Sequence, residues 1–435
     1  MSNAAVTFMV AAPKKRSRAR GALARYRHAR RTLRTPASRQ SRHGLDWTNF
    51  FIADLQTGFG TFVAFYLASL GWSQANVGVA LGLSGFAGVF GQIPGGALAD
   101  GMPWKRVLVG IGVSMICAAA LILALWPTPA LVFVAETLHG LSSGVITPTI
   151  AAISLGLVGR RAMSLRTGRN FRFSAAGTAL TALTLGAIGS LISARAIFLV
   201  AAALCAPALI ALSQIRSEEI DYRRARNAAS GQEGGTFARV IDLAKNRNLL
   251  LFAACIVLFQ FANASILPLV SESLAARATT MGAAMTSSLI VGPQIVVALL
   301  APWVGYHSEA WGRKPLLLVG IGFEAVRATL FSFVTNFPAM IAIQLLDGVS
   351  GAIINVLTVL VIADLTAGTG RFNLAQGVVG AMTGVAASTS IALTGLIFDA
   401  FGRGVGFLII GGVAAVATAM VWILLPETKP EQYQD

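Results

Sequence analysis

The feature that most constrains the fold of this chain is a succession of long apolar segments from about residue 47 to residue 425. Each has roughly 20 residues or more, the length of helix that crosses the hydrocarbon core of a bilayer. Inside that core, only helices and closed barrels satisfy their own backbone hydrogen bonds. Hydrophobic residues make up 55% of the 435 residues and charged residues only 12%, which excludes an ordinary soluble domain. The sequence therefore predicts an all-α integral membrane protein.

We count twelve such segments and expect each to form one transmembrane helix. The expected spans are 47–70, 75–100, 107–126, 129–158, 168–192 and 195–214, then 247–275, 279–306, 314–334, 337–366, 371–400 and 404–425. A charged, Gly- and Ser-containing loop, residues 215–246, divides them into two sets of six. The expected organisation is a basic N-terminal tail (1–46), a first bundle (47–214), the linker loop, a second bundle (247–425) and a short C-terminal tail (426–435).

The distribution of basic residues predicts the orientation. The chain has a net charge of +16, and its 34 Lys and Arg residues gather in the N-terminal tail, the linker, the C-terminal tail and alternate short connections. The exceptions are Arg195, Arg277, Arg327 and Arg403. By the positive-inside rule, both termini and the linker are cytoplasmic, in what we expect to be a bacterial inner membrane. Contact with anionic lipid and membrane topology explain the charge, so no nucleic-acid partner is expected.

Three short motifs recur at nearly one offset on either side of the linker. The stretch "GALADGMPWKRVLV" recurs as "GYHSEAWGRKPLLL". "HGLSSG", with Gly140, recurs as "DGVSGA", with Gly348, and "GRN" recurs as "GRFN". Such echoes predict an internal duplication, which in a polytopic membrane protein points to two pseudo-symmetric bundles around a central site.

On these motifs the chain resembles the major facilitator superfamily of secondary transporters. The hallmark of that family is a Gly, Asp, Gly, Arg and Lys signature in the cytoplasmic turn between helices two and three, repeated between helices eight and nine. The second copy here matches it at Gly305, Gly312, Arg313, Lys314 and Pro315, with Glu309 in place of Asp. The first copy keeps Gly96, Leu98, Asp100, Lys105 and Arg106, but has Gly101, Pro103 and Trp104 where the pattern usually has Arg, Gly and Arg. The resemblance implies transport by alternating access between two six-helix bundles.

The charged loops are predicted to hold the gate. A carboxylate at a helix end that faces a Lys or Arg of the next helix or of the neighbouring bundle can stabilise one arrangement of the halves. Asp100 and Glu309 are the expected carboxylates. Arg169 and Arg371, at the starts of spans five and eleven, either pair with such carboxylates or serve only as topology signals. The residues assigned to the gating loops are Asp100, Lys105, Arg106, Glu309, Gly312, Arg313, Lys314, Arg169 and Arg371.

Polar side chains inside the spans are the candidates for binding solute or protons, because they are costly in a membrane. The resemblance implies that spans one, four, seven and ten line a central cavity. The ionisable residues of these spans, expected to couple protons or contact substrate, are Asp54, Glu136, His139 and Asp347. The amides, which either contact substrate or bind neighbouring helices, are Gln56, Gln260, Asn263 and Gln344.

Glu136 and His139 are three residues apart on one helix, so their side chains project from nearly the same face and can form a proton-handling pair. A structural ion pair or helix–helix hydrogen bond is the alternative. Glu324 and Arg327 in span nine have the same spacing and opposite charges, so we expect them to neutralise each other. Asp364, near the end of a span, is expected at the membrane interface.

Other chemistry has no support in the sequence. It contains no phosphate-binding loop, no His-Glu-x-x-His motif and no Cys cluster, so no enzyme, cofactor or metal site is predicted. The leading hypothesis is a monomeric, proton-coupled exporter of a small organic molecule, amphipathic or cationic. The alternatives are a solute importer by proton symport and a non-transporting sensor or assembly factor on the same scaffold.

Overall fold

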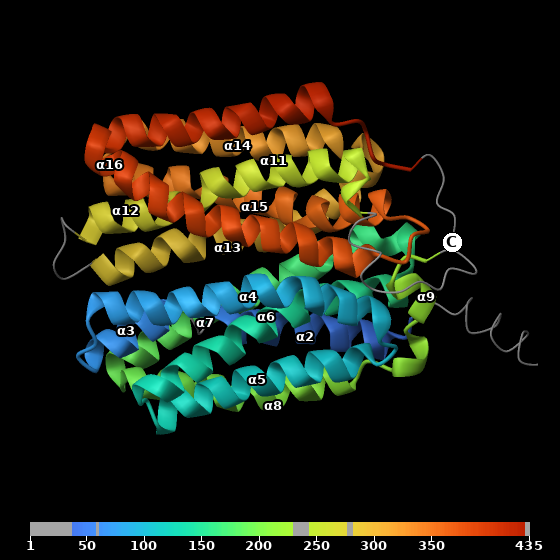
Figure 1. Ribbon diagram of the computed structural model, residues 1–435, viewed down its shortest axis with the longest axis horizontal. Helices are drawn as coiled ribbons and strands as arrows, with labels where there is room; N and C mark the ends of the chain where they lie inside the picture. The colour runs from blue at the N-terminus through green and yellow to red at the C-terminus, as the bar shows by residue number, and fades with distance from the viewer. Residues whose placement is uncertain (1–36, 58–60, 229–242, 276–281, 431–435) are drawn as a thin grey trace, which may run out of the picture. The chain divides into compact units, whose positions relative to one another are not determined.

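The computed structural model describes residues 37–57, 61–228, 243–275 and 282–430, and these residues are almost entirely helical (Figure 1). The first half contains α2 (Arg39–Thr57), α3 (Thr61–Ser69), α4 (Gln74–Gly101), α5 (Lys105–Leu125), α6 (Pro129–Val158), α7 (Met163–Leu191) and α8 (Ala194–Ser213). The second half contains α11 (Arg247–Ala264), α12 (Ile266–Ala275), α13 (Gly282–Trp311), α14 (Lys314–Phe333), α15 (Phe337–Leu365) and α16 (Phe372–Leu424). Between the halves, the described part of the linker holds the short helix α9 (Tyr222–Ala225).

The twelve predicted spans can all be traced along these helices. Ten helices of the described chain are long and apolar enough to cross a membrane. One of them, α16, contains both span eleven and span twelve, which meet at Gly402. The φ of Gly402 is +77°, a conformation that residues with a side chain rarely adopt, and the chain reverses there. Span one is divided between α2 and α3. The all-helical fold with twelve transmembrane helices is therefore confirmed.

Several helices extend beyond the apolar segments that predicted them. Helix α2 begins at Arg39 rather than near residue 47, and α7 begins at Met163 rather than near residue 168. Helix α13 continues to Trp311, so the turn in "GYHSEAWGRKPLLL" is confined to Gly312 and Arg313. Hydropathy does not detect these extra turns, because their polar side chains are satisfied inside the protein rather than by lipid.

The two halves repeat one packing scheme. In the first half α4 packs on α6, α5 on α8 and α2 on α7, while in the second half α13 packs on α15, and α14 and α11 both pack on α16. Gly140 of α6 lies so close to α4 that a Cβ would overlap the carbonyl oxygen of Ser84. Gly348 of α15 likewise has no room for a Cβ beside Pro293 of α13. The duplication inferred from the sequence is thus visible in equivalent close contacts.

The halves meet mainly through two helix pairs, α4 with α16 and α7 with α13. Four glycines make these contacts possible, because a Cβ on any of them would overlap the backbone of the opposing helix. They are Gly96 and Gly377 in the first pair, and Gly168 and Gly305 in the second. Gly305, predicted as part of a turn, is therefore a helix-packing residue.

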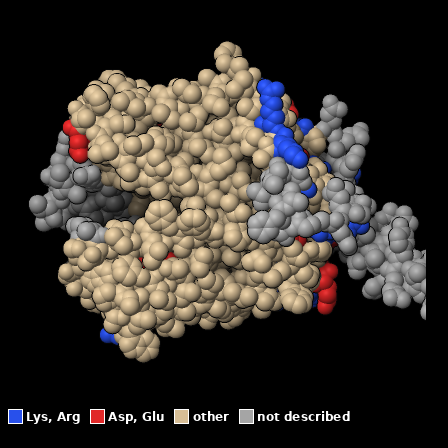
Figure 2. All heavy atoms as spheres, in the orientation of Figure 1, with Lys and Arg blue, Asp and Glu red and all other residues tan. Residues whose placement is uncertain are grey.

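The outer faces of the helices are apolar. Exposed large side chains include Phe86, Phe90, Leu183, Leu396 and Trp422. Figure 2 shows one face of the molecule almost free of charged atoms, which gather towards its ends. Such a continuous apolar surface suits contact with lipid. The protein is a multi-pass membrane protein.

Candidate functional site

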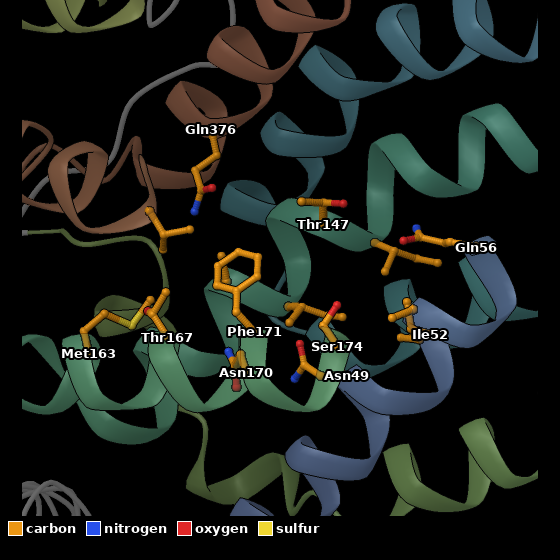
Figure 3. A pocket seen from close by; sticks show the side chains of 15 residues that line it. Asn49, Ile52, Gln56, Thr147, Met163, Thr167, Asn170, Phe171, Ser174 and Gln376 are labelled. Atoms are coloured by element: carbon orange, nitrogen blue, oxygen red, sulfur yellow. The ribbon is translucent and has the colours of Figure 1, made fainter. Parts of the chain in front are cut away.

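Two adjoining cavities lie where the halves meet. The larger, of about 550 Å³, is lined by α4, α6, α7, α11, α13, α15 and α16. The smaller, of about 190 Å³, is lined by α2, α6 and α7 together with two residues of the second half (Figure 3). Thr147, Phe171, Val359 and Gln376 line both cavities, so they form one continuous region between the halves.

The predicted cavity residues fall into two groups. Gln56 lines the smaller cavity, and Gln260, Asn263 and Asp347 line the larger one. The other predicted residues, Glu136, His139 and Gln344, line neither. Asp54 lies on α2 but its side chain is outside the described ones. Among the described residues, no cluster of His, Cys, Asp or Glu could hold a metal ion.

Sequence reasoning missed six amides of the cavities: four lie outside spans one, four, seven and ten, the spans considered for this lining, and two, Asn49 and Asn355, lie within spans one and ten. Spans two, five, eight and eleven contribute as well. The additional amides are Gln92, Gln294 and Gln376, together with Asn49, Asn170 and Asn355 of α2, α7 and α15. The signal that could have found them is an amide inside an apolar segment, whatever the number of that segment.

Asp347 is held by a neighbouring arginine. Nη1 of Arg327 donates to Oδ1 of Asp347, to Oε2 of Glu324 at 3.1 Å and to Oδ1 of Asn263 at 3.0 Å. Arg327 and Glu324 are buried, whereas the Asp347 side chain is 27% exposed to the cavity side. Arg327 therefore bonds not only to Glu324, the partner that its spacing predicts, but also to residues of two other helices, so it links α11, α14 and α15.

Glu136 and His139 lie together between α4 and α6. Glu136 is fully buried, and neither carboxylate oxygen has a hydrogen bond of standard geometry in the described part of the chain; its polar neighbour is Ser84. Ser84 Oγ also lies 3.1 Å from Nδ1 of His139. Ser143 Oγ donates to the His139 carbonyl at 3.2 Å and accepts from Nε2 of Gln56 at 3.5 Å. Hydrogen bonds thus lead from Gln56, which lines the smaller cavity, to the backbone of His139.

Asp100 connects the two halves. Its carboxylate accepts hydrogen bonds from the backbone N–H of Leu374 at 2.8 Å, and from the backbone and side chain of Asn373 at 3.3 and 2.9 Å. These groups are at the first turn of α16, where N–H groups have no partner within the helix. Lys105, the basic residue expected beside it, acts on Asp100 electrostatically. The hydrogen bonds of Asp100 go instead to a helix N-terminus of the other half, two and three residues beyond Arg371.

The basic residues of the first loop stay in their own half. Lys105 donates to the carbonyls of Ala99 and Met102 and lies 5.0 Å from the centroid of the Tyr222 ring. Arg106 donates to Ser213 O at 3.1 Å and to Ser217 Oγ at 3.0 Å. Both residues thus attach the loop to the linker.

The linker itself closes this end of the molecule, which we call the linker end. Tyr222 donates its hydroxyl to the carbonyls of Asp100 and Gly101, both at 3.0 Å. Nδ2 of Asn227 donates to Ala363 O of the second half at 2.6 Å. Nδ2 of Asn373 donates to Ala225 O at 2.9 Å. The described linker residues therefore bind both halves at once.

The second loop is built around Arg313, which is buried. Arg313 donates to Glu309 Oε1 at 3.0 Å, to Asp364 Oδ2 at 3.1 Å and to Ser308 O at 2.7 Å. Asp364 lies one residue before the end of α15, where the sequence suggests the membrane interface, but its side chain is buried within the protein and only 5% exposed. The other oxygen of Asp364 lies 3.9 Å from Nη2 of Arg160 in the first half. The ion pair of Glu309 with Arg313 lies within the second half, four residues apart on the chain.

Two further contacts of the loops were not predicted. Glu427, beyond α16, accepts from the backbone N–H groups of Arg313 at 2.8 Å and Lys314 at 3.1 Å. Asp46, fully buried on α2, accepts from Arg166 at 2.5 Å and from Arg169 at 2.6 Å. Arg169 therefore pairs with Asp46 and not with Asp100 or Glu309, the pairing that was one of the two alternatives left open for it. Asp46 was not predicted as a contact because it is the last residue of a strongly basic stretch that was assigned to the N-terminal tail.

Comparisons with known proteins agree with this architecture. The family model of the Major Facilitator Superfamily matches residues 47–261 and again residues 249–435. Two proteins described as uncharacterized MFS-type transporters, from Mycobacterium tuberculosis strains CDC 1551 and H37Rv, are each 36% identical over 387 residues, covering 88% of this chain and 93% of the relative. A crystal structure of a mutant of the nucleoside transporter NupG has a similar fold, with a TM-score of 0.64, 16% identity, and coverage of 88% of this chain and 98% of that one.

Proposed function

Because the chain belongs to the Major Facilitator Superfamily and is a membrane transporter of that family, we propose that it exports a small organic solute in exchange for protons. The two cavities between the halves would hold the solute, and rocking of the halves would expose them to each side of the membrane in turn. The protein works as a monomer in this proposal, since each chain contains both halves and the complete cavity region.

The observation that carries the proton part of the proposal is the burial of Glu136. A carboxylate that is cut off from water and lacks a cationic partner is stable only with its proton. Glu136 is in such a place among the described residues, whereas the buried carboxylate of Glu324 has Arg327 beside it. The path through Ser143 and Gln56 gives a route by which solute binding and proton binding can influence each other.

We place the linker end in the cytoplasm, since the basic connections lie there. Asp100, Tyr222 and Asn227 close that end, so the described conformation is an outward-facing one in this proposal. In an antiport cycle this is the state that loads protons from outside. A protonated Glu136 fits that step.

The test is transport in inverted membrane vesicles with an imposed pH gradient, across a panel of uncharged, cationic and anionic solutes. Antiport predicts solute accumulation driven by protons leaving the vesicle. Movement of solutes only together with protons would replace export by symport, the alternative function. Transport that ignores the pH gradient altogether would contradict proton coupling.

Glu136→Gln sharpens the test, because glutamine imitates a permanently protonated carboxyl group. Proton-driven accumulation should fall to the background level, while exchange of labelled for unlabelled solute should continue. Glu324→Gln is the matched control, since it makes the same change at a buried carboxylate of a membrane helix that has a cationic partner, Arg327. If both variants lost exchange as well as accumulation, Glu136 would be a structural residue rather than the proton site.

A further inference from the structure

The described lining of the two cavities consists of amides, hydroxyls and apolar groups. The larger cavity has six amide side chains, Gln92, Gln260, Asn263, Gln294, Asn355 and Gln376, and the smaller one adds Asn49, Gln56 and Asn170. Asp347 is the one ionisable side chain among the described lining residues. Amides both donate and accept hydrogen bonds, so they suit solutes that carry oxygen or N–H groups without a net charge.

The single carboxylate does not make the cavity selective for cations. Asp347 is bonded to Arg327, which is buried and also bonded to Glu324 and Asn263. A cationic solute would meet a carboxylate whose charge is already offset by Arg327, and drawing Asp347 away would leave the buried Arg327 with less compensation. The expectation of a cationic solute rested on counting carboxylates, and this arrangement removes Asp347 from that count.

Gln376 is the one lining amide with a buried and unsatisfied donor among the described residues. Its Nε2 atom is buried and has no hydrogen-bond partner among the described residues. Figure 3 shows the side chain reaching from α16 into the region beside Phe171 that both cavities share. The next residue, Gly377, packs directly against the backbone of Gln92 on α4, and this contact fixes the backbone position of Gln376. A buried donor without an acceptor is costly, so an acceptor on a bound solute would be favoured there.

We propose, resting on the transport function proposed above, that the solute is an uncharged molecule with several hydroxyl or carbonyl oxygens and an apolar face. Gln376 donates through Nε2 to one of those oxygens, and Phe171 contacts the apolar face. Gln376 is then a specificity-determining residue contributed by the second half at the meeting point of the two cavities. The combined space suits a solute of ordinary metabolite or drug size.

The experiment measures solute binding to the purified full chain in detergent, by the shift of its melting temperature, with no proton gradient present. The panel contains uncharged glycosides, nucleosides and polyols, quaternary ammonium compounds, and aromatic carboxylates. We expect shifts from one or more uncharged members and none from the cations or anions. Gln376→Leu should weaken the binding of the best uncharged solute about 3- to 10-fold, the range for one lost hydrogen bond to an uncharged partner.

Gln344→Leu is the matched control, because Gln344 is a buried amide that also lacks a hydrogen-bond partner among the described residues but lines neither cavity. It should leave binding unchanged. A response only to cations that disappears in Asp54→Asn or Asp347→Asn would overturn the proposal, as would a panel in which no uncharged solute binds. Equal weakening by Gln376→Leu and Gln344→Leu would overturn the role of Gln376. The binding measurement uses no gradient, so it does not depend on antiport. If an uncharged solute bound but the vesicles showed no exchange of solute for protons, antiport would be refuted and the proposed solute class would stand.

Discussion

The two copies of the charged loop have taken different partners. In the first copy, Asp100 reaches across to the other half and binds the N-terminus of α16. In the second copy, Glu309 and Asp364 both bind Arg313 within their own half, and Glu427 binds the backbone at the start of α14. The first loop therefore bonds directly to the other half through its carboxylate, whereas the carboxylate of the second loop bonds within the second half.

The loop that matches the family signature better is therefore not the loop whose carboxylate bonds to the other half. The second copy matches the family signature better, yet the first copy provides the carboxylate that spans the halves. The hydrogen bonds of Asp100 come from the free N–H groups of a helix end, which Gly96 allows to approach closely. The second loop uses its preserved arginine in a buried ion cluster, which the first half approaches through Arg160, 3.9 Å from Asp364.

The largest effect should come from removing the centre of the second loop. Arg313→Ala would leave the buried Asp364 with the distant Arg160 and would take the ion-pair partner from Glu309. Breaking a buried ion pair in this way costs about 3–5 kcal/mol. We expect a clearly lower melting temperature and poor recovery of folded protein in detergent. Lys314→Ala, at the neighbouring basic residue, is the control and should be close to wild type. Equal stability of the two variants would contradict the fastening role of Arg313.

Asp100→Ala should act on conformation more than on stability. It removes charge-assisted hydrogen bonds to α16. The conformation with the linker end closed should lose about 2 kcal/mol of stability relative to the open one, which changes the ratio of the two populations roughly 30-fold. The distance between spin labels at Trp104 and Trp311, exposed residues that end the loops of the two halves, reports this opening. An unchanged distance distribution would show that Asp100 does not hold the linker end closed.

The fold was predictable because its main signals are local. Apolar length predicts the spans, and motif repetition predicts the duplication; both depend on residues close together in the chain. The site was only partly predictable. Gln56, Gln260, Asn263 and Asp347 line the cavities as the choice of spans suggested. The binding partners of Asp100, Asp347 and Arg169 lie 20 to 274 residues away or at a helix end, and hydropathy carries no information on such pairings.

Asp46 and Glu427 illustrate the limit best. Each lies at the edge of an apolar segment, where a carboxylate is ordinarily exposed and predicts no particular contact. In the folded protein, Asp46 is fully buried between two arginines and Glu427 accepts four backbone hydrogen bonds. Only the three-dimensional approach of distant segments turns these residues into structural anchors.

Glu427 gives a pH-dependent test of the second loop. Burial raises the pKa of Glu427, but the backbone N–H groups of Arg313, Lys429, Lys314 and Thr428 outweigh it and hold the pKa below its ordinary value of 4.5. A lowered pKa means that the carboxylate stabilises the fold above pH 4.5 and that this contribution disappears as the pH falls through the lower, folded-state pKa. Glu427→Ala should cost about 1 kcal/mol near neutral pH, as for a lost helix cap.

The melting temperature of wild type minus that of Glu427→Ala should therefore be constant near neutral pH and shrink in acid. Glu218→Ala, at an exposed acidic residue of the linker, is the control and should show a small difference at every pH. A difference between wild type and Glu427→Ala that grew in acid would have the wrong sign and would contradict the capping role.

The smallest expected effect comes from Glu309, one of the two carboxylates that the sequence assigns to the gate. Glu309→Gln removes a charge that is 29% exposed, and Arg313 keeps its bonds to Asp364 and Ser308. Partly exposed ion pairs contribute about 0.2–1 kcal/mol, and this one lies within a single half, so the cost should fall on stability rather than on the equilibrium between conformations. The label distance between positions 104 and 311 should stay that of the wild type. If Glu309→Gln opened the linker end as far as Asp100→Ala does, the two loops would be equivalent gates after all, and the buried Arg313 cluster would have to move with each transport cycle.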